Sequence, residues 1–379
     1  MEKAAELFAH DGVNITLDGE RHIGAVIGSQ QFKEQFVNEK VEKWVMDVHK
    51  LSCIAKEEPQ SSLSAFNTGM SQRWKYLQRT VSDIEHLFEP LEKAIREKFI
   101  PALCGRTVSD LERHIFALPY RYGGMGILNP VQTARIEYES SCEITAALTA
   151  LIYEQDLDLT HLDTDEMERR KVAVKTRKDE RLKEECERIL SLVDVKSKRL
   201  ILAAQEKGAS PWFSALPLSK FGYTVNRQEF QDAICLRYGW RIKEMPSVCG
   251  CGQENSVDHV LICKKGGYVS MRHNALRDTE GKIMSEVCHD VKIEPRLLQT
   301  DRERTNGNAA DGARLDIAAR GVWSQYQQTF FDVRVCYPNA ESYRGKSLDA
   351  IYRENENQKK RAYNDRILNK RQASHRWFL

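Results

Sequence analysis

The sequence predicts an α+β multidomain protein, with a mostly helical N-terminal half and an α/β region at the C-terminus. Three observations predict this organisation. Apolar residues recur at intervals of three and four over residues 31–100, as on one face of a helix. Cys and His residues cluster within 249–263, and short apolar segments alternate with helical patterns after residue 266. The chain has 379 residues, which is enough for two or three domains with separate cores.

Composition excludes several classes of protein. Hydrophobic residues are 41% and charged residues 30%, which rules out a wholly disordered chain. The formal net charge is +2, so any basic surface for nucleic acid must be local. No apolar run reaches about 18 residues, so we expect no membrane partner. The charged N-terminus is not a secretory signal, and single scattered cysteines fit reduced thiols, so we expect a nuclear or cytoplasmic protein that is not secreted.

Residues 11–28 predict a β-hairpin. Residues 13–16 alternate in polarity, Asp18 and Gly19 offer a turn, and residues 22–28 form the returning strand. An isolated hairpin is marginally stable in water, so we expect segment 1–28 to be the end of a larger element.

Residues 29–165 predict a helical domain whose aromatic stripes form the core rather than a cofactor site. Within it, residues 119–126 contain three glycines, but no phosphate-binding motif surrounds them, so this segment is a predicted turn. Segment 166–244 is dense in charges of both signs and predicts a solvated helical linker region, broken at residues 208–211. A helix is predicted around residues 227–238.

Four residues have the pattern C-x-C-x7-H-x3-C and define the Cys/His cluster: Cys249, Cys251, His259 and Cys263. Zn²⁺ prefers four such ligands in a tetrahedron, and the last two residues, four apart, share a helix face. A structural zinc would stabilise segment 245–266, which is too small to build a core. The alternative is a set of buried thiols beside a chance histidine.

Two aspartates, Asp316 and Asp332, interrupt apolar segments that predict strands at 313–319 and 329–336. On neighbouring strands their carboxylates could share a divalent cation such as Mg²⁺, and a lysine from the predicted helix 347–370 could complete a phosphodiester hydrolase. The alternative is that both aspartates lie in turns or salt bridges. Further elements predicted here are a helix at 271–289 and a strand at 291–295.

The C-terminal half resembles the end of reverse transcriptases from non-LTR retrotransposons that carry a restriction-like endonuclease. In that family a CCHC zinc knuckle precedes a PD-(D/E)xK-type nuclease. The N-terminal half is similar to the end of a reverse transcriptase, with Arg21 to Gly24 resembling the last palm hairpin and the following helices resembling the thumb. The matching stretches of the C-terminal half are residues 232–240, 249–263, 272–274, 313–316, 331–335 and 356–363.

The resemblance implies a role for individual residues. Asp316 and Asp332 would hold Mg²⁺ or Mn²⁺ in an α/β endonuclease core at 267–379. The catalytic helix would carry Glu356, Lys359, Lys360 and Tyr363, with either lysine as the catalytic one. Glu286 matches an acidic residue of the first nuclease helix only loosely.

Two residues depart from the family pattern: Leu315 replaces a proline, and Arg334 replaces a lysine that Arg cannot imitate as a base. The chain ends soon after the catalytic helix, so we expect the core to lack its last strand and the chain to be truncated at both ends.

The implied function is nicking of target DNA for retrotransposition, with target DNA and element RNA as partners. No Asp-Asp pair occurs in the chain, so we expect no polymerase active site. The alternative function is a catalytically inactive fragment or remnant that binds RNA or DNA through its thumb-like helices and zinc knuckle.

Overall fold

The computed structural model describes residues 16, 18–155, 163–265, 268–297, 313–368 and 373–378. The chain divides into two compact units, Met1–Tyr238 and Gly239–Leu379, called here the first and second unit. The sequence predicted five segments; in the structure the hairpin and the charged helices belong to the first unit, and the Cys/His cluster and the α/β region belong to the second. No described helix is both long and apolar enough to cross a bilayer.

The first unit begins with a hairpin of strands β1 (Gly19–His22) and β2 (Ala25–Gly28), which pair antiparallel. The predicted turn at Asp18 and Gly19 is wrong, because Gly19 pairs with Gly28 inside the ladder and the chain reverses at Ile23 and Gly24. Residues 11–15 of the predicted hairpin lie outside the described residues.

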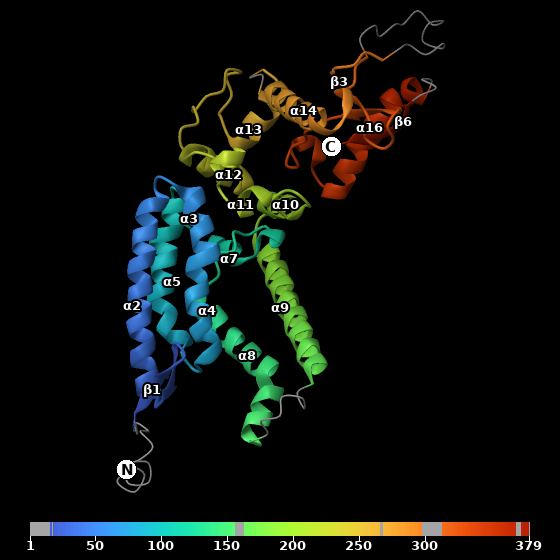
Figure 1. The fold of residues 1–379 in the computed structure, drawn as a ribbon. Coiled ribbons are helices and arrows are strands. Elements are labelled where there is room, and N and C mark those ends of the chain that lie inside the picture. The colour runs from blue at the N-terminus through green and yellow to red at the C-terminus, as the bar shows by residue number, and fades with distance from the viewer. Residues whose placement is uncertain are drawn as a thin grey trace, which may run out of the picture. The chain divides into compact units, whose positions relative to one another are not determined.

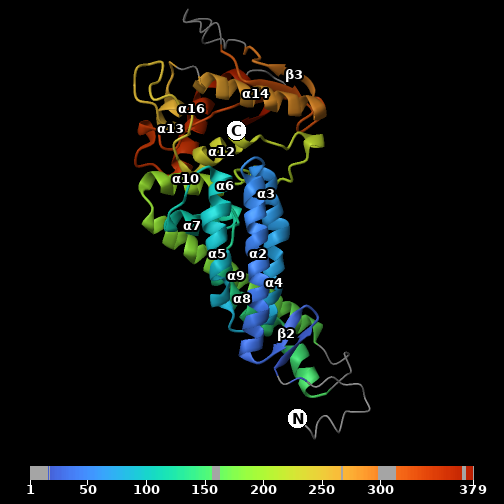
Figure 2. The same ribbon diagram turned by 90° about the vertical axis from the view of Figure 1, so that its left-hand side faces the viewer.

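A helical core follows the hairpin, and Figures 1 and 2 show its helices α2, α4 and α5 side by side. Its buried aromatic side chains include Phe66 and Phe99, whose rings stack with centroids 4.6 Å apart and are fully buried. The prediction that the aromatic stripes form core is therefore confirmed. The elements of this core are α2 (Gln30–Ala55), α3 (Pro59–Ala65), η1 (Phe66–Met70), α4 (Ser71–Thr80), η2 (Glu85–Phe88), α5 (Glu89–Ala94), η3 (Ile95–Phe99) and α6 (Ile100–Cys104).

The remainder of the first unit includes the glycine-rich segment 119–126, where a short 3₁₀ helix (η4, Tyr120–Tyr122) leads into the predicted turn at Gly123. Gly123 has φ +82, and a Cβ there would lie 2.9 Å from the carbonyl oxygen of Ile201, so this position requires glycine. Tyr238 Oη donates a 3.0 Å hydrogen bond to Gly123 O, which ties the turn to the last helix of the unit. The elements are α7 (Asp110–Ala117), η4 (Tyr120–Tyr122), α8 (Pro130–Tyr153), α9 (Thr164–Leu192), α10 (Val195–Gln205), α11 (Pro211–Ser214), η6 (Ser219–Phe221) and α12 (Arg227–Tyr238).

The second unit contains a four-stranded sheet in the order β3-β4-β5-β6. Strands β3, β4 and β5 pair antiparallel, whereas β6 pairs parallel to β5. We expected no strand after the last long helix, and this expectation is wrong, because β6 follows that helix and extends the sheet (Figure 1). The elements are α13 (Val257–Ile262), α14 (Tyr268–Val287), β3 (His289–Ile293), β4 (Ile317–Arg320), β5 (Gln328–Asp332), η7 (Glu341–Tyr343), α16 (Leu348–Leu368) and β6 (Ala373–Phe378).

The sheet of the second unit is covered by a helix on each face. Successive residues of a strand point to opposite faces. Ala318 and Phe330 pack in one apolar cluster with Ile367 of α16, whereas Ile317 and Phe331 pack in another with Met284 of α14. This α/β/α layering places the ends of β4 and β5 between the two helices, where the candidate site lies.

Candidate functional site

Asp316 and Asp332 are cross-strand neighbours. Ile317 of β4 is paired with Phe331 of β5, so the antiparallel register brings the preceding Asp316 opposite Asp332. The backbone N–H of Val333 donates to Asp316 Oδ2 at 2.7 Å, which fixes this carboxylate beside the end of β5. Asp316 is 9% exposed and Asp332 only 3%. We call this pair the carboxylate site.

One lysine of α16 reaches the carboxylate site. Lys359 Nζ lies 2.7 Å from Asp332 Oδ2, and it also lies 5.6 Å from the centroid of the Tyr363 ring. Lys360 instead forms an ion pair with Glu356 one turn earlier on an exposed part of the helix. Tyr363 packs against the apolar cluster between α16 and the sheet. The structure therefore brings Lys359 to the aspartates and directs Lys360 and Glu356 elsewhere.

Helix α14 supplies two polar groups that the sequence analysis did not assign to the site. His273 Nε2 lies 2.9 Å from Asp316 Oδ1. Glu280, seven residues later on the same helix face, has a buried Oε2 atom for which the described residues provide no hydrogen-bond partner. Glu286, the acidic residue considered from the sequence, is exposed. The seven-residue spacing of His273 and Glu280 is the sequence signal that could have identified this face.

Two carboxyl groups near Asp316, those of Asp332 and Glu280, have raised pKa values. Burial raises the pKa of Asp332, and the negative charge of Asp316 raises it further, while Lys359 opposes both effects; the pKa is raised overall. Burial also raises the pKa of Glu280, and Asp316 adds to this. The raised pKa values of Asp332 and Glu280 mean that both carboxyl groups resist ionisation, and a nearby cation would stabilise their charged forms.

The Cys/His cluster of the second unit can hold a metal ion such as zinc. Its four ligand atoms all lie within 4.8 Å of one another, and no other such group of three or more was found among the described residues. Cys249 Sγ and Cys263 Sγ are 3.8 Å apart, and Cys251 Sγ lies 3.2 Å from His259 Nε2. The side-chain oxygens around the carboxylate site do not form a group of three or more ligand atoms within this distance.

Local structure explains the shape of the cluster. Cys249 N donates to Gln253 O at 2.9 Å and Gly252 N donates to Cys249 O at 2.8 Å, which forms a tight turn around the first two cysteines. Gly252 has φ +85, a conformation that suits glycine. Ser256 Oγ caps α13 by accepting from His259 N, so the helix places His259 and Cys263 opposite the turn.

Two polar contacts attach the cluster to the α/β core within the second unit. The Tyr337 hydroxyl donates to the Asp258 carboxylate on α13, and Arg272 Nη2 donates to Leu261 O at 3.3 Å. Tyr337 lies five residues after Asp332, the last residue of β5. Its hydrogen bond to Asp258 therefore connects α13 to the segment that follows β5. Burial, and then the hydrogen bond to Asp258, raise the pKa of Tyr337, which keeps it a donor.

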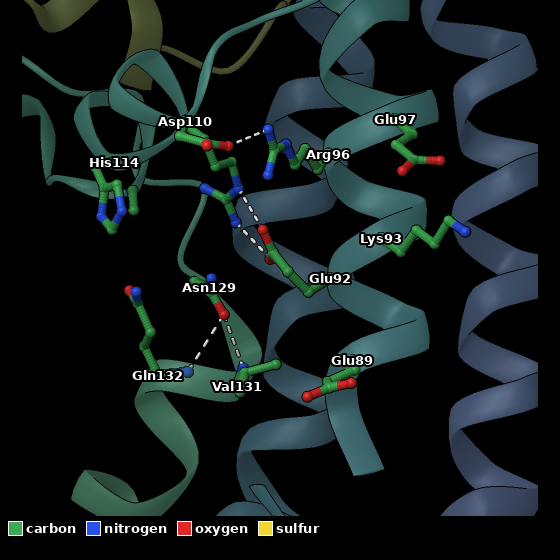
Figure 3. Close-up of a pocket in the computed structure, with 12 residues that line it drawn as sticks. Glu89, Glu92, Lys93, Arg96, Glu97, Asp110, His114, Asn129, Val131 and Gln132 are labelled. Atoms are coloured by element: carbon green, nitrogen blue, oxygen red, sulfur yellow. Dashed lines mark hydrogen bonds and ion pairs between the residues drawn. The ribbon is translucent and has the colours of Figure 1, made fainter. Parts of the chain in front are cut away.

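A pocket of about 540 Å³ lies in the first unit between α5, α7 and the start of α8 (Figure 3). Four of its charged side chains form two ion pairs. Arg113 donates through Nε and Nη2 to the two carboxylate oxygens of Glu92, each at 2.7 Å, and Arg96 pairs with Asp110. Asn129 Oδ1 caps α8 by accepting from Val131 N. These pairs join three helices, so we assign the pocket a structural role.

A comparison of the chain with protein-family models gives no match, and neither does a comparison with curated proteins. The function is therefore inferred from the geometry of the second unit.

Proposed function

We propose that the second unit is a metal-dependent DNA endonuclease that nicks target DNA, of the type carried by non-LTR retrotransposons. The observation that supports this proposal best is the arrangement of Asp316 and Asp332 on adjacent strands with Lys359 held on Asp332. A pair of carboxylates with one lysine is a minimal set for phosphodiester hydrolysis. The site is built from segments that the family resemblance identified in the same order.

The donor set fits a hard divalent cation, Mg²⁺ or Mn²⁺. Asp316 and Asp332 offer carboxylate oxygens, and Glu280 offers a buried oxygen that no described group satisfies. Asp316 and Asp332 would hold the cation, which when bound would supply positive charge opposite the scissile phosphate. Among the described residues no third ligand converges with these two carboxylates, so Glu280 is a neighbour of the pair rather than one of its ligands.

The residues of the chain have separate tasks in this proposal. Asp316 is fixed by His273 and by the backbone of Val333, so it is the rigid member of the pair. Lys359 is oriented by Asp332 and by the Tyr363 ring, and its ammonium group can hold the attacking water by donating hydrogen bonds and can stabilise charge that develops on the phosphate.

For the Cys/His cluster we propose a structural zinc ion. A tetrahedral zinc with Zn–S bonds of about 2.3 Å separates two sulfurs by about 3.8 Å, and Cys249 Sγ and Cys263 Sγ are 3.8 Å apart. All four ligands come from the chain, which leaves no open position for catalysis. In this proposal zinc stabilises the turn and α13, which contact the nuclease core through Tyr337 and Arg272.

Partners and location follow from the same proposal. Target DNA is the substrate, and element RNA is expected from the resemblance of the first unit to a polymerase thumb. Action on chromosomal DNA requires entry to the nucleus.

Nicking of a supercoiled plasmid tests the proposed function. The full chain, with zinc content and thermal unfolding checked, is incubated with Mg²⁺ or Mn²⁺ beside Asp332→Asn. We expect nicking that requires the divalent cation, stops with EDTA, returns with excess Mg²⁺ and is lost in the variant. A folded, zinc-loaded chain that does not nick, or an Asp332→Asn chain that nicks at the same rate, would refute the enzyme and favour a binding module.

A further inference from the structure

We infer that Arg334 binds a phosphate of the DNA strand beside the carboxylate site. This inference rests on the proposed function for the nature of the substrate, and it adds a substrate-binding residue. Arg334 occupies a position where the resembled family has a lysine, but its guanidinium stays protonated and cannot exchange a proton at neutral pH. Its chemistry is that of an anion binder.

Contacts with α16 place Arg334 next to the carboxylate site. Asp332 contacts Lys359, and Arg334, two residues later, contacts Asn355 through Nε at 3.1 Å. Asn355 and Lys359 are four residues apart and so lie on the same face of α16. The guanidinium therefore lies one helical turn along the helix from the lysine that holds Asp332.

A buried polar network supports Arg334. Asn355 is 6% exposed, and its Nδ2 donates to Ile351 O at 2.8 Å. The Tyr343 hydroxyl lies 2.9 Å from Asn355 Nδ2 and 3.1 Å from Oδ1. Burying an amide is costly unless it is hydrogen-bonded, and here the amide is fully engaged and so holds its Oδ1 toward Arg334 Nε.

The rest of the guanidinium faces outward. Arg334 is exposed, and no hydrogen bond or ion pair found among the described residues uses its Nη1 or Nη2 atoms. Four N–H donors in a planar fork therefore remain, and this geometry matches two oxygens of a phosphate.

Arg113 of the first unit is an arginine whose outer nitrogens, unlike those of Arg334, are used within the protein. It is 4% exposed, and its Nη groups donate to Glu92 and to the carbonyl of Ile127. An arginine that serves folding thus uses its Nη atoms within the protein, whereas Arg334 uses only Nε and is held with its outer donors exposed.

Binding of a short DNA duplex measures this role without cleavage. We would use the full chain carrying Asp332→Asn, without added Mg²⁺ or Mn²⁺, and follow fluorescence anisotropy over a range of salt concentrations. Adding Arg334→Gln should weaken binding about tenfold and lower the slope of log affinity against log salt by about one, as expected for loss of one phosphate contact. The melting temperature should change little, because Asn355 loses only its bond to Arg334 Nε and keeps its bonds to Tyr343 and Ile351.

Arg353→Gln is the matched control. Arg353 is an exposed arginine of α16, and it lies roughly 160° around the helix from Asn355. Arg353→Gln removes the same charge as Arg334→Gln, but on the side of α16 that faces away from Asn355, so it should change the affinity and the salt slope much less. Equal losses in the two variants, or an Arg334→Gln chain that binds as its parent does, would overturn the inference, as would a parent that does not bind the duplex.

The outcomes separate this inference from the proposed function. A wild-type chain that fails to nick, together with a selective loss of binding in Arg334→Gln, would refute the nuclease and retain the phosphate contact. A wild-type chain that nicks, together with normal binding in Arg334→Gln, would retain the nuclease and refute the contact.

Discussion

The ammonium group of Lys359 lies 2.7 Å from Asp332 Oδ2, which joins helix α16 to the end of strand β5. The Asp332 side chain is 3% exposed and the Lys359 side chain 20%. Such buried pairs contribute little to stability, because desolvation of the two charges offsets their attraction. Since Asp316 also lies beside Asp332, the arrangement concentrates charges that a stable fold does not require. We therefore infer that Asp332 and Lys359 are held together for function rather than for stability.

Glu280 gives a pH-dependent prediction for stability. Its pKa is raised above the ordinary value of 4.5, first by burial and then by Asp316. The folded state thus holds a proton more tightly than the unfolded state, so stability falls as pH rises through the interval above 4.5. Glu280→Gln cannot ionise and should therefore raise the melting temperature of the second unit near pH 8 by on the order of a few degrees, an advantage that disappears below pH 4.5.

Glu286→Gln serves as its control in thermal unfolding at both pH values. Glu286 is exposed on the same helix, so its substitution should not change the melting temperature at either pH. A Glu280→Gln chain with the same melting temperature as wild type near pH 8 would show that Glu280 does not resist ionisation.

Loss of zinc should destabilise the second unit selectively. Cys251→Ser removes one ligand of the Cys/His cluster, and structural zinc binding is worth on the order of 10 kcal/mol in small modules. We expect elemental analysis to detect zinc in wild type and little in the variant. Proteolysis should become faster in residues 245–266 and around Tyr337, which contacts Asp258, while the first unit stays protected.

Cys53→Ser controls for the loss of a thiol, because Cys53 is exposed and lies in the first unit. A Cys251→Ser chain that keeps its zinc and its protease resistance would contradict the zinc assignment.

The first unit should depend strongly on its aromatic stack. Phe66 is fully buried against Phe99, and Phe66→Ala should cost about 3–5 kcal/mol through lost burial and a cavity. Urea unfolding followed by circular dichroism would measure this cost as a lower midpoint for the helical transition. Tyr153→Ala, at a residue 90% exposed, should change the free energy of unfolding by about 0.5 kcal/mol or less. Similar costs for the two variants would refute the core assignment.

Features encoded locally were predicted well from the sequence. Helix α12 spans Arg227–Tyr238 as predicted, and the aromatic periodicity of the first unit marks its core. The Cys/His cluster is also local, because its ligands lie within one short segment whose spacing constrains how they can meet. Each of these features leaves a periodicity or a spacing within one segment of the chain, which is why it could be predicted.

Features set by packing were not predictable. The hairpin reverses at Ile23 because Tyr76 of α4 donates a 2.5 Å hydrogen bond to Ile23 O, a long-range contact that outweighs the local turn preference of Asp18 and Gly19. Strand β6 pairs parallel to the distant β5, and such pairing leaves no local pattern. Which of Lys359 and Lys360 reaches Asp332 depends on how α16 is rotated against the sheet. In the same way, the burial of the Glu280 side chain depends on how α14 is rotated, which the sequence does not reveal.

The most direct test of the account compares nicking by Lys359→Met and Lys360→Met. The two lysines are adjacent, lose the same charge and length on substitution, and differ in that Lys359 contacts Asp332 while Lys360 pairs with Glu356. We expect Lys359→Met to nick a supercoiled plasmid about 10²–10⁴-fold more slowly than wild type with Mg²⁺, and Lys360→Met to stay close to wild type. Equal rates in the two variants, or a greater loss in Lys360→Met, would contradict this expectation.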